Sequence, residues 1–213
     1  MAKITLTRLP KETKPTAQNK IVAVTESGKT TPAEFLLEST KKGDYKLYGI
    51  IDSARNEEVF RYLITGNVEY KSLFEGTLDV QSFGVSGFLV ECIKESPLFT
   101  WMTSEAWGEN CCIFFTSKSN FEDLFTHFQQ FNRVYLEDEK VVLFRYYDPR
   151  VLRTYLPSCS LNEIDLFFGD VQAFYAESED PTIIHEFKKV TSIGKEILSI
   201  SGHKIKIEDS STT

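Results

Sequence analysis

Strand-like and helix-like segments alternate along most of this chain, and that alternation limits it to folds in which helices cover a β-sheet. Short apolar runs predict strands over residues 45–51, 69–74, 87–93, 111–116, 133–136, 140–147 and 171–176. Segments with apolar residues at helical spacing separate them, in the order βαββαβαββααβ. The predicted fold class is therefore α+β, or mixed α/β, with a mixed sheet covered by helices.

Capping residues indicate where the helices begin. Ser96 and Asp148 each precede a proline, and this pair of residues favours the first turn of a helix. Residues 119–122 (Ser-Asn-Phe-Glu) and 160–163 (Ser-Leu-Asn-Glu) have the sequence of a capping box, in which two side chains satisfy backbone N–H groups reciprocally. A further helix is predicted over residues 55–64, where apolar side chains recur four residues apart.

The two ends of the chain differ in pattern from the segment between them. Residues 10–20 are rich in Pro, Lys and Thr, which is typical of a linker or arm, and a short helix is predicted at 31–37. Near the other end we predict a helix from residue 181 and then a hairpin with strands at 197–200 and 204–207. The chain is therefore divided into an N-terminal arm or extra strands (1–46), a main domain (47–177) and a C-terminal helix and hairpin extension (178–213).

The net charge of −7 is unevenly distributed. Residues 1–46 contain 9 Lys and Arg against 5 Asp and Glu, whereas residues 47–213 contain 15 against 26. Binding to phosphate backbones needs a basic face, so the acidic body argues against nucleic acid as a partner. The start of the chain lacks the apolar segment of a signal peptide, and the apolar runs are far shorter than the ~20 residues that span a bilayer. We therefore expect a cytoplasmic protein with no membrane partner.

One segment resembles a phosphate-binding loop. Residues 23–30 read A-x-x-x-x-G-K-T, in which Lys29 would reach the terminal phosphates and Thr30 would hold Mg²⁺. Three features oppose this interpretation: Ala23 replaces the first glycine, Glu26 would repel phosphate, and Pro32 falls where a long helix should already be hydrogen-bonded. A small nucleotide-binding protein using Lys29 and Thr30 nevertheless stays open as an alternative function.

No other pattern indicates catalysis or a cofactor. The three histidines are far apart in sequence, and the four cysteines include no C-x-x-C pair, so neither set predicts a metal site. We interpret the cysteines as small buried apolar residues. These residues are His127, His185, His203, Cys92, Cys111, Cys112 and Cys159. We expect no cofactor, no metal and no enzymatic activity.

The strand-to-helix junction around residue 148 is the predicted partner-binding site. It gathers arginines and tyrosines, which are favoured at interfaces because guanidinium groups bind carboxylates through two hydrogen bonds and stack on rings. If residues 140–147 form a strand, the two tyrosines point to opposite faces and one of them faces a partner. The candidate residues are Arg145, Tyr146, Tyr147, Asp148, Arg150 and Arg153.

A second interpretation of the same junction is internal. Arg145 would then pair with a carboxylate such as Asp52, at the end of the strand predicted over 45–51, and would lock the sheet. The sequence supports the two interpretations equally.

Several stretches of the chain, taken in order, resemble the adaptor family of bacterial type VI secretion systems, the effector chaperones called Tap or TEC proteins. They are L-Y-G-I-I-D-S-A-R at 47–55, Y-K-S-L-F-E-G-T at 70–77, S-P-L at 96–98, W-G at 107–108, F-R-Y-Y-D-P-R-V-L at 144–152, L-P at 156–157 and F-F-G at 167–169. The resemblance covers residues 47–177, which would be the adaptor domain, and leaves out both ends of the chain.

The resemblance implies a binding protein of Gram-negative bacteria. Members of the family bind a cognate toxic effector, often through its N-terminal region, and load it onto the VgrG spike. A protein that neutralises a toxin is a further alternative, because it would share the acidic surface but would block the toxin instead of escorting it.

Overall fold

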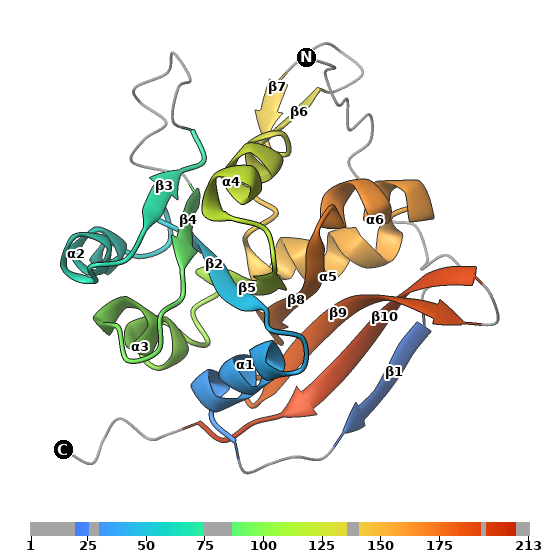
Figure 1. Ribbon diagram of the computed structural model, residues 1–213, viewed down its shortest axis with the longest axis horizontal. Helices are drawn as coiled ribbons and strands as arrows, with labels where there is room; N and C mark the ends of the chain where they lie inside the picture. Colours follow the sequence, from blue (N-terminus) through green and yellow to red (C-terminus); the bar gives the residue numbers. More distant parts are fainter. Residues whose placement is uncertain (1–19, 26–29, 75–86, 136–140, 193–194, 208–213) are drawn as a thin grey trace.

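The computed structural model describes residues 20–25, 30–74, 87–135, 141–192 and 195–207. Most of its strands form one eight-stranded sheet, in the order β1-β10-β9-β8-β5-β2-β4-β3 (Figure 1). The neighbouring strands are antiparallel, except for β1 and β10, which are parallel. The sheet strands are β1 (Lys20–Thr25), β2 (Lys46–Asp52), β3 (Tyr70–Ser72), β4 (Gly87–Glu91), β5 (Cys112–Ser117), β8 (Val171–Glu177), β9 (Ile183–Ser192) and β10 (Lys195–Lys204).

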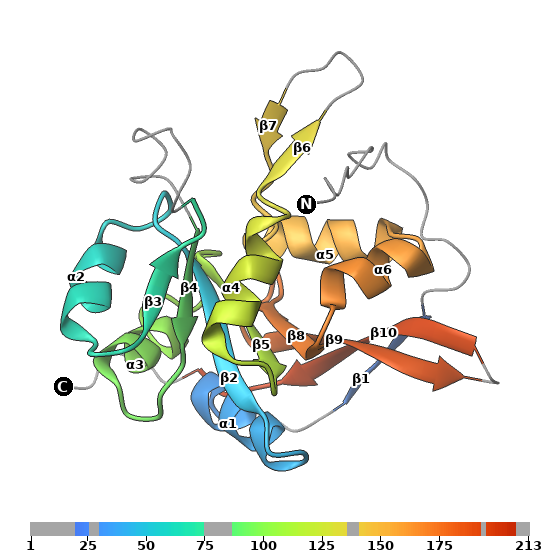
Figure 2. The same cartoon turned by 45° about the horizontal axis from the view of Figure 1, so that its top comes forward.

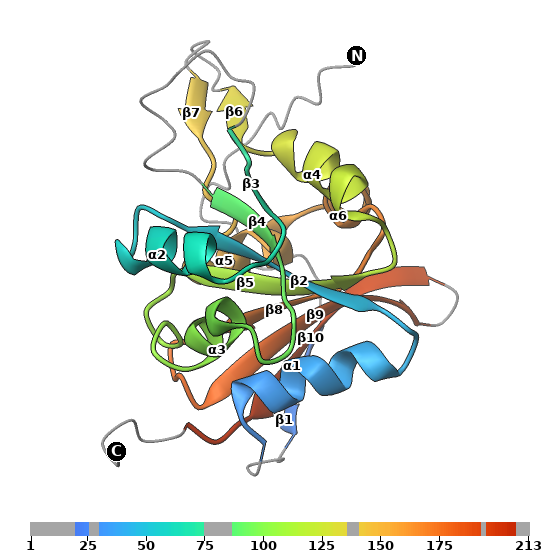
Figure 3. The same cartoon turned by 60° about the vertical axis from the view of Figure 1, so that its left-hand side comes forward.

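Helices cover both faces of this sheet. Buried side chains of α1 (Pro32–Lys41), α2 (Glu58–Thr65) and α3 (Pro97–Thr103) share one apolar core, and those of α4 (Phe121–Gln129), α5 (Pro149–Ser158) and α6 (Leu161–Phe168) share the other. In Figure 3, α1 and α3 lie on one side of the sheet, and α4 and α6 lie on the other. A separate hairpin of β6 (Arg133–Tyr135) and β7 (Val141–Leu143) projects beyond the helices in Figure 2.

Alternation along the central strands supplies both cores. In β2, Tyr48 and Ile50 belong to the core under α4–α6, whereas Leu47 and Ile51 belong to the core under α1–α3. Successive strand residues point to opposite faces, so an uninterrupted apolar strand fits a sheet that is buried on both sides. The predicted α+β class with a helix-covered sheet is confirmed, as is the element order βαββαβαββααβ from β2 to β8.

The caps that the sequence indicated are mostly in place. Ser96, Asp148 and Ser160 each cap a helix, and Ser160 forms the predicted box with Glu163. The box predicted at 119–122 is wrong, because the cap of α4 is Asn120, whose side chain accepts a hydrogen bond from the Asp123 N–H at 2.9 Å.

The prediction for the C-terminal segment is wrong in its first element. Residues 183–192 form β9 instead of a helix, and residues 197–207, predicted as a hairpin, are largely the single strand β10 that pairs with β9. Ile184 and Phe187 are three residues apart, a spacing that is compatible with one face of a helix. In the structure they point to opposite faces of the sheet, and each enters a different core. Burial of both faces, and not helical spacing, explains the pattern.

Candidate functional site

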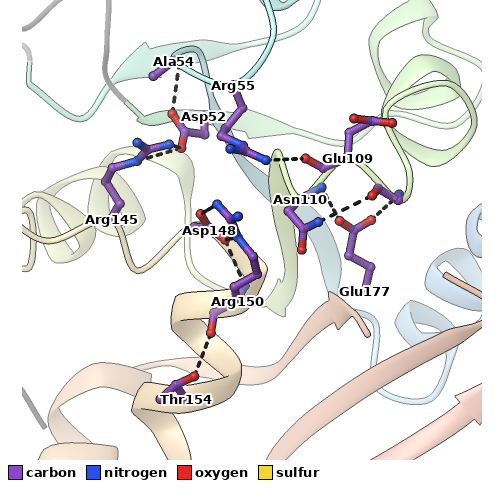
Figure 4. Close-up of polar contacts among 11 residues, drawn as sticks. Asp52, Ala54, Arg55, Glu109, Asn110, Arg145, Asp148, Arg150, Thr154 and Glu177 are labelled. Atoms are coloured by element: carbon purple, nitrogen blue, oxygen red, sulfur yellow. Dashed lines mark hydrogen bonds and ion pairs between the residues drawn. The ribbon is translucent and has the colours of Figure 1, made fainter. Parts of the chain in front are cut away.

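Two strands that run in the same direction each end in a buried acidic residue, at the same end of the sheet. Asp52 is the last residue of β2 and Glu177 is the last residue of β8; β2 and β8 run in the same direction because each is antiparallel to β5. Asp148, at the start of α5, joins them in the close-up of Figure 4. All three residues are buried, with 0%, 3% and 4% relative exposure for Asp52, Glu177 and Asp148. Buried carboxylates need partners, and each of these has them.

Asp52 pairs with Arg145 across 93 residues of sequence. The Arg145 Nε donates to Asp52 Oδ2 at 2.9 Å, and Nη2 donates to the same oxygen. The other oxygen, Oδ1, accepts from the Ala54 N–H at 3.0 Å, which shapes the turn that presents Arg55. Burial raises the pKa of Asp52, and the hydrogen bonds and charge of Arg145 offset this effect only in part. The internal interpretation of Arg145 is therefore confirmed.

Asp148 caps α5 and orients Arg150 at the same time. Its Oδ1 accepts from the Arg150 N–H at 3.0 Å, which is the capping bond. The Arg150 guanidinium also binds the carboxylate through two hydrogen bonds: Nε donates to Oδ1 at 3.0 Å, and Nη2 donates to Oδ2 at 2.6 Å. Burial alone would raise the pKa of Asp148, but the hydrogen bonds from Arg150, with the charges of Arg150 and Arg55, lower it.

Glu177 holds the loop between α3 and β5 against the end of β8. Its two carboxylate oxygens accept from the backbone N–H groups of Gly108 and Asn110. Gly108 has a φ of +94°, a conformation that favours glycine. The Arg153 Nη1 donates to the backbone carbonyl of Glu177, and the Trp107 indole donates to Pro181 O at 2.9 Å. The W-G pair of the resemblance therefore has a structural role in this loop.

The two tyrosines of the junction lie in the core. Tyr146 and Tyr147 are 0% and 1% exposed, and the Tyr146 hydroxyl donates to Phe128 O at 3.0 Å. The expectation that one of them faces a partner is wrong, because the strand β7 ends at Leu143 and the following turn buries both rings. Burial raises the pKa of both phenols, so they stay neutral.

The arginines are the surface of this site. The side chains of Arg145 and Arg150 are 37% and 51% exposed; Arg55 is exposed and Arg153 is partly exposed. Arg55 donates from Nη2 to Glu109 O at 3.3 Å. We call Arg55, Arg145, Arg150 and Arg153 the arginine cluster. At this junction, buried acidic and aromatic side chains therefore lie beneath exposed guanidinium groups.

Sequence reasoning singled out part of this junction, namely Asp52, Arg145, Tyr146, Tyr147, Asp148, Arg150 and Arg153. Glu177, Glu109 and Asn110 were not singled out, and Arg55 entered through the resemblance alone. An acidic residue at the end of an apolar strand, as Glu177 is at the end of β8, is the signal that would have identified the most buried of them.

Only the two ends of the phosphate-loop segment are described: residues 23–25 belong to β1, and Thr30 precedes α1. Lys29 falls outside the described residues, and Thr30 directly precedes Thr31, the cap of α1. The Thr30 carbonyl accepts from the Lys206 N–H at 2.9 Å. Strand β1 pairs with β10 at the end of the sheet order.

The cysteines and His127 lie among buried side chains. All four cysteines are free and buried, as predicted. The His127 Nε2 is 3.0 Å from Phe167 O, and burial lowers the pKa of His127. Within the described ranges, no group of three or more His, Cys, Asp or Glu side chains is arranged to hold a metal ion. Of the described helices, none has the length and apolar character needed to cross a membrane.

A second charged group lies on β9 and β10. Glu186 contacts Lys188 Nζ at 2.6 Å and His203 Nε2 at 3.4 Å, and the His203 ring lies against Phe35 of α1. Burial would raise the pKa of Glu186, but the hydrogen bonds and charges of His203 and Lys188 lower it to about 2. This group ties the C-terminal hairpin together beside α1.

The comparison with protein families places the chain in one of them. Residues 47–166 match the family described as a domain of unknown function, DUF4123, and this is more than half of the chain. The protein belongs to the DUF4123 family, which is associated with adaptors of type VI secretion effectors. All four residues of the arginine cluster lie inside the matched segment. No curated protein and no solved structure gave a significant match.

Proposed function

We propose that the protein is an adaptor of a type VI secretion system, which binds a cognate toxic effector and loads it onto the VgrG spike. The observation that supports this proposal is membership in the DUF4123 family over residues 47–166. In this proposal the adaptor works by binding in the cytoplasm of a Gram-negative bacterium and catalyses no reaction. The effector contact is expected to involve its N-terminal region.

The arginine cluster is the proposed contact surface; Arg150 is its candidate anchor, and Arg153 follows it on α5. Both arginines project from the first turns of α5, and the buried Asp148 holds Arg150 in place. A guanidinium that is already oriented loses less conformational entropy when a partner binds. Tyr146, Tyr147 and Asp148 support this surface from below and do not contribute contacts themselves.

Affinity capture from the native bacterium tests the proposal. The full-length protein, with a C-terminal tag, serves as bait, and the captured proteins are identified by mass spectrometry. We expect a VgrG protein and one large effector. Deletion of the gene should stop secretion of that effector and leave the toxicity of the purified effector unchanged.

The same bait separates the alternatives. A Lys29→Ala variant should capture the same partners as the wild type, because the proposal gives the phosphate-loop segment no role. Bound nucleotide that disappears in Lys29→Ala, with neither partner captured, would contradict the adaptor proposal and favour the nucleotide-binding protein. Inhibition of the toxin's activity, without an effect on secretion, would identify a neutralising protein instead.

A further inference from the structure

Three guanidinium groups surround two buried carboxylates near the C-terminal ends of β2 and β8. Arg55, Arg145 and Arg150 lie around Asp52 and Asp148 in Figure 4, so positive charge exceeds negative charge in this group by one. Glu177 accepts hydrogen bonds from the N–H groups of the α3–β5 loop, and its charge acts on Arg150 and on Arg153. Counting Glu177 together with Arg153, the fourth member of the arginine cluster, leaves the excess of one positive charge unchanged. Glu109 offers Arg55 its carbonyl oxygen, and its carboxylate points away from Arg55 in Figure 4.

The arrangement leaves hydrogen-bond donors at the surface. A guanidinium has five N–H donors. The bonds described above use Nε and Nη2 in both Arg145 and Arg150, and Nη2 in Arg55. The carboxylates that hold Arg145 and Arg150 are buried, whereas the Arg145 side chain is partly exposed and the Arg150 side chain is exposed. The cluster therefore presents oriented donors and excess positive charge to whatever approaches it.

The chemistry of the cluster favours a carboxylate as the incoming group. Guanidinium groups bind carboxylates in a planar, two-bonded geometry. Phosphate groups can accept the same two hydrogen bonds from a guanidinium. A nucleic acid, however, would bring many negative charges close to a protein with a net charge of −7. A short acidic protein segment places one or two carboxylates on the cluster and avoids most of this repulsion.

We propose that Arg55 and Arg150 bind an aspartate or glutamate side chain of an acidic segment in the protein partner. Arg145 stays on Asp52 and fixes the turn that carries Arg55, so it is a positioning residue for this contact. The proposal rests on the proposed function where it identifies the partner as the effector. The chemistry of the recognised segment follows from the cluster itself.

Selection from a library of short random peptides displayed on phage tests the proposal without knowledge of the effector. The full-length protein is the target, and the best peptide is then synthesised for affinity measurements. We expect enrichment of Asp and Glu in the selected peptides. Replacing one acidic residue of the best peptide by its amide should weaken binding roughly tenfold or more, and binding should weaken as salt is added.

Substitutions in the cluster assign the contact to named residues. Arg55→Glu should weaken peptide binding roughly 30-fold or more, because it places a like charge at the contact. Arg150→Gln removes the charge but keeps an N–H donor for Asp148, and should weaken binding roughly tenfold; Arg150→Lys should retain more affinity. The control is Arg61→Glu on α2, an exposed arginine outside the cluster, which should bind like the wild type.

The outcomes separate this inference from the proposed function. Selected peptides without acidic enrichment, or equal affinity for wild type, Arg55→Glu and Arg150→Gln with native circular dichroism, would overturn the inference. Displacement of the peptide by a single-stranded oligonucleotide at physiological salt would show a polyanion site instead. Capture of the effector by an Arg55→Glu, Arg150→Gln double variant would leave the adaptor function intact and refute this contact.

Discussion

Removal of the Arg145 side chain tests whether the buried ion pair holds the junction together. The Asp52 side chain is 0% exposed and that of Arg145 is 37% exposed. Arg145→Ala leaves Asp52 with the Ala54 N–H and without its cation. Breaking a buried pair by removing one partner costs about 3–5 kcal/mol. Because Arg145 is partly exposed, water can reach the vacated space, and we expect a loss of about 2–3 kcal/mol in the free energy of unfolding.

Urea unfolding followed by tryptophan fluorescence measures this loss. Trp101 and Trp107 are both buried, so their emission reports exposure of the core. The matched control is Arg61→Ala, because Arg61 and Glu58 form an exposed ion pair on α2. Exposed pairs contribute little, so the control should lose less than about 0.5 kcal/mol.

The pH dependence gives a second, independent measurement on the same variant. Without Arg145, burial raises the pKa of Asp52 further above its value in the unfolded chain. The folded variant then favours the protonated carboxyl, so its deficit relative to the wild type should shrink as the pH falls through this raised pKa. A deficit below about 0.5 kcal/mol at neutral pH, or one that is equal at neutral and acidic pH, would refute the argument that Asp52 depends on Arg145.

Two further predictions concern the packing and the second charged group. Gly87→Ala would place a methyl group 2.7 Å from the Tyr147 ring, so the ring must move, and we expect a loss of about 1–3 kcal/mol by thermal unfolding; an unchanged midpoint would contradict the close contact. Glu186→Gln should cost on the order of 2 kcal/mol at pH 7, because the lowered pKa of Glu186 stabilises the fold above its unfolded value of about 4.5. That difference should disappear as the pH falls towards about 2, and a difference that persists there would contradict its electrostatic origin.

Local features of the sequence were sufficient for most of the secondary structure. The caps at Ser96, Asp148 and Ser160 act within one turn of their own helix, so the residues that form them are adjacent in the chain. Apolar runs such as 112–117 are short and bounded by turns, which favours strands. The two-sided burial of the sheet follows from these uninterrupted runs and from the helices between them.

Features that depend on distant pairing were not predictable from local pattern. Residues 183–192 have helical spacing, yet they form β9 because β8 and β10 provide backbone partners on both sides. Tyr146 and Tyr147 were expected on a strand, and the fold instead buries both in the core that α4, α5 and α6 share. Hydrogen bonding to neighbouring strands and burial between layers decide such segments, and neither is encoded within a window of ten residues.

The candidate site likewise combines features that are local in sequence with features that depend on the fold. The residue types around 145–153 determined by themselves that arginines, tyrosines and an aspartate cap would meet at one junction, because they are neighbours in sequence. Which of them are exposed depends on the assembled fold, because Asp52 lies 93 residues from Arg145 in the sequence and Glu177 lies 24 residues from Arg153. Burial of the acids and rings beneath the guanidinium groups is a property of the assembled layers, and it turns a basic stretch of sequence into a surface with oriented donors.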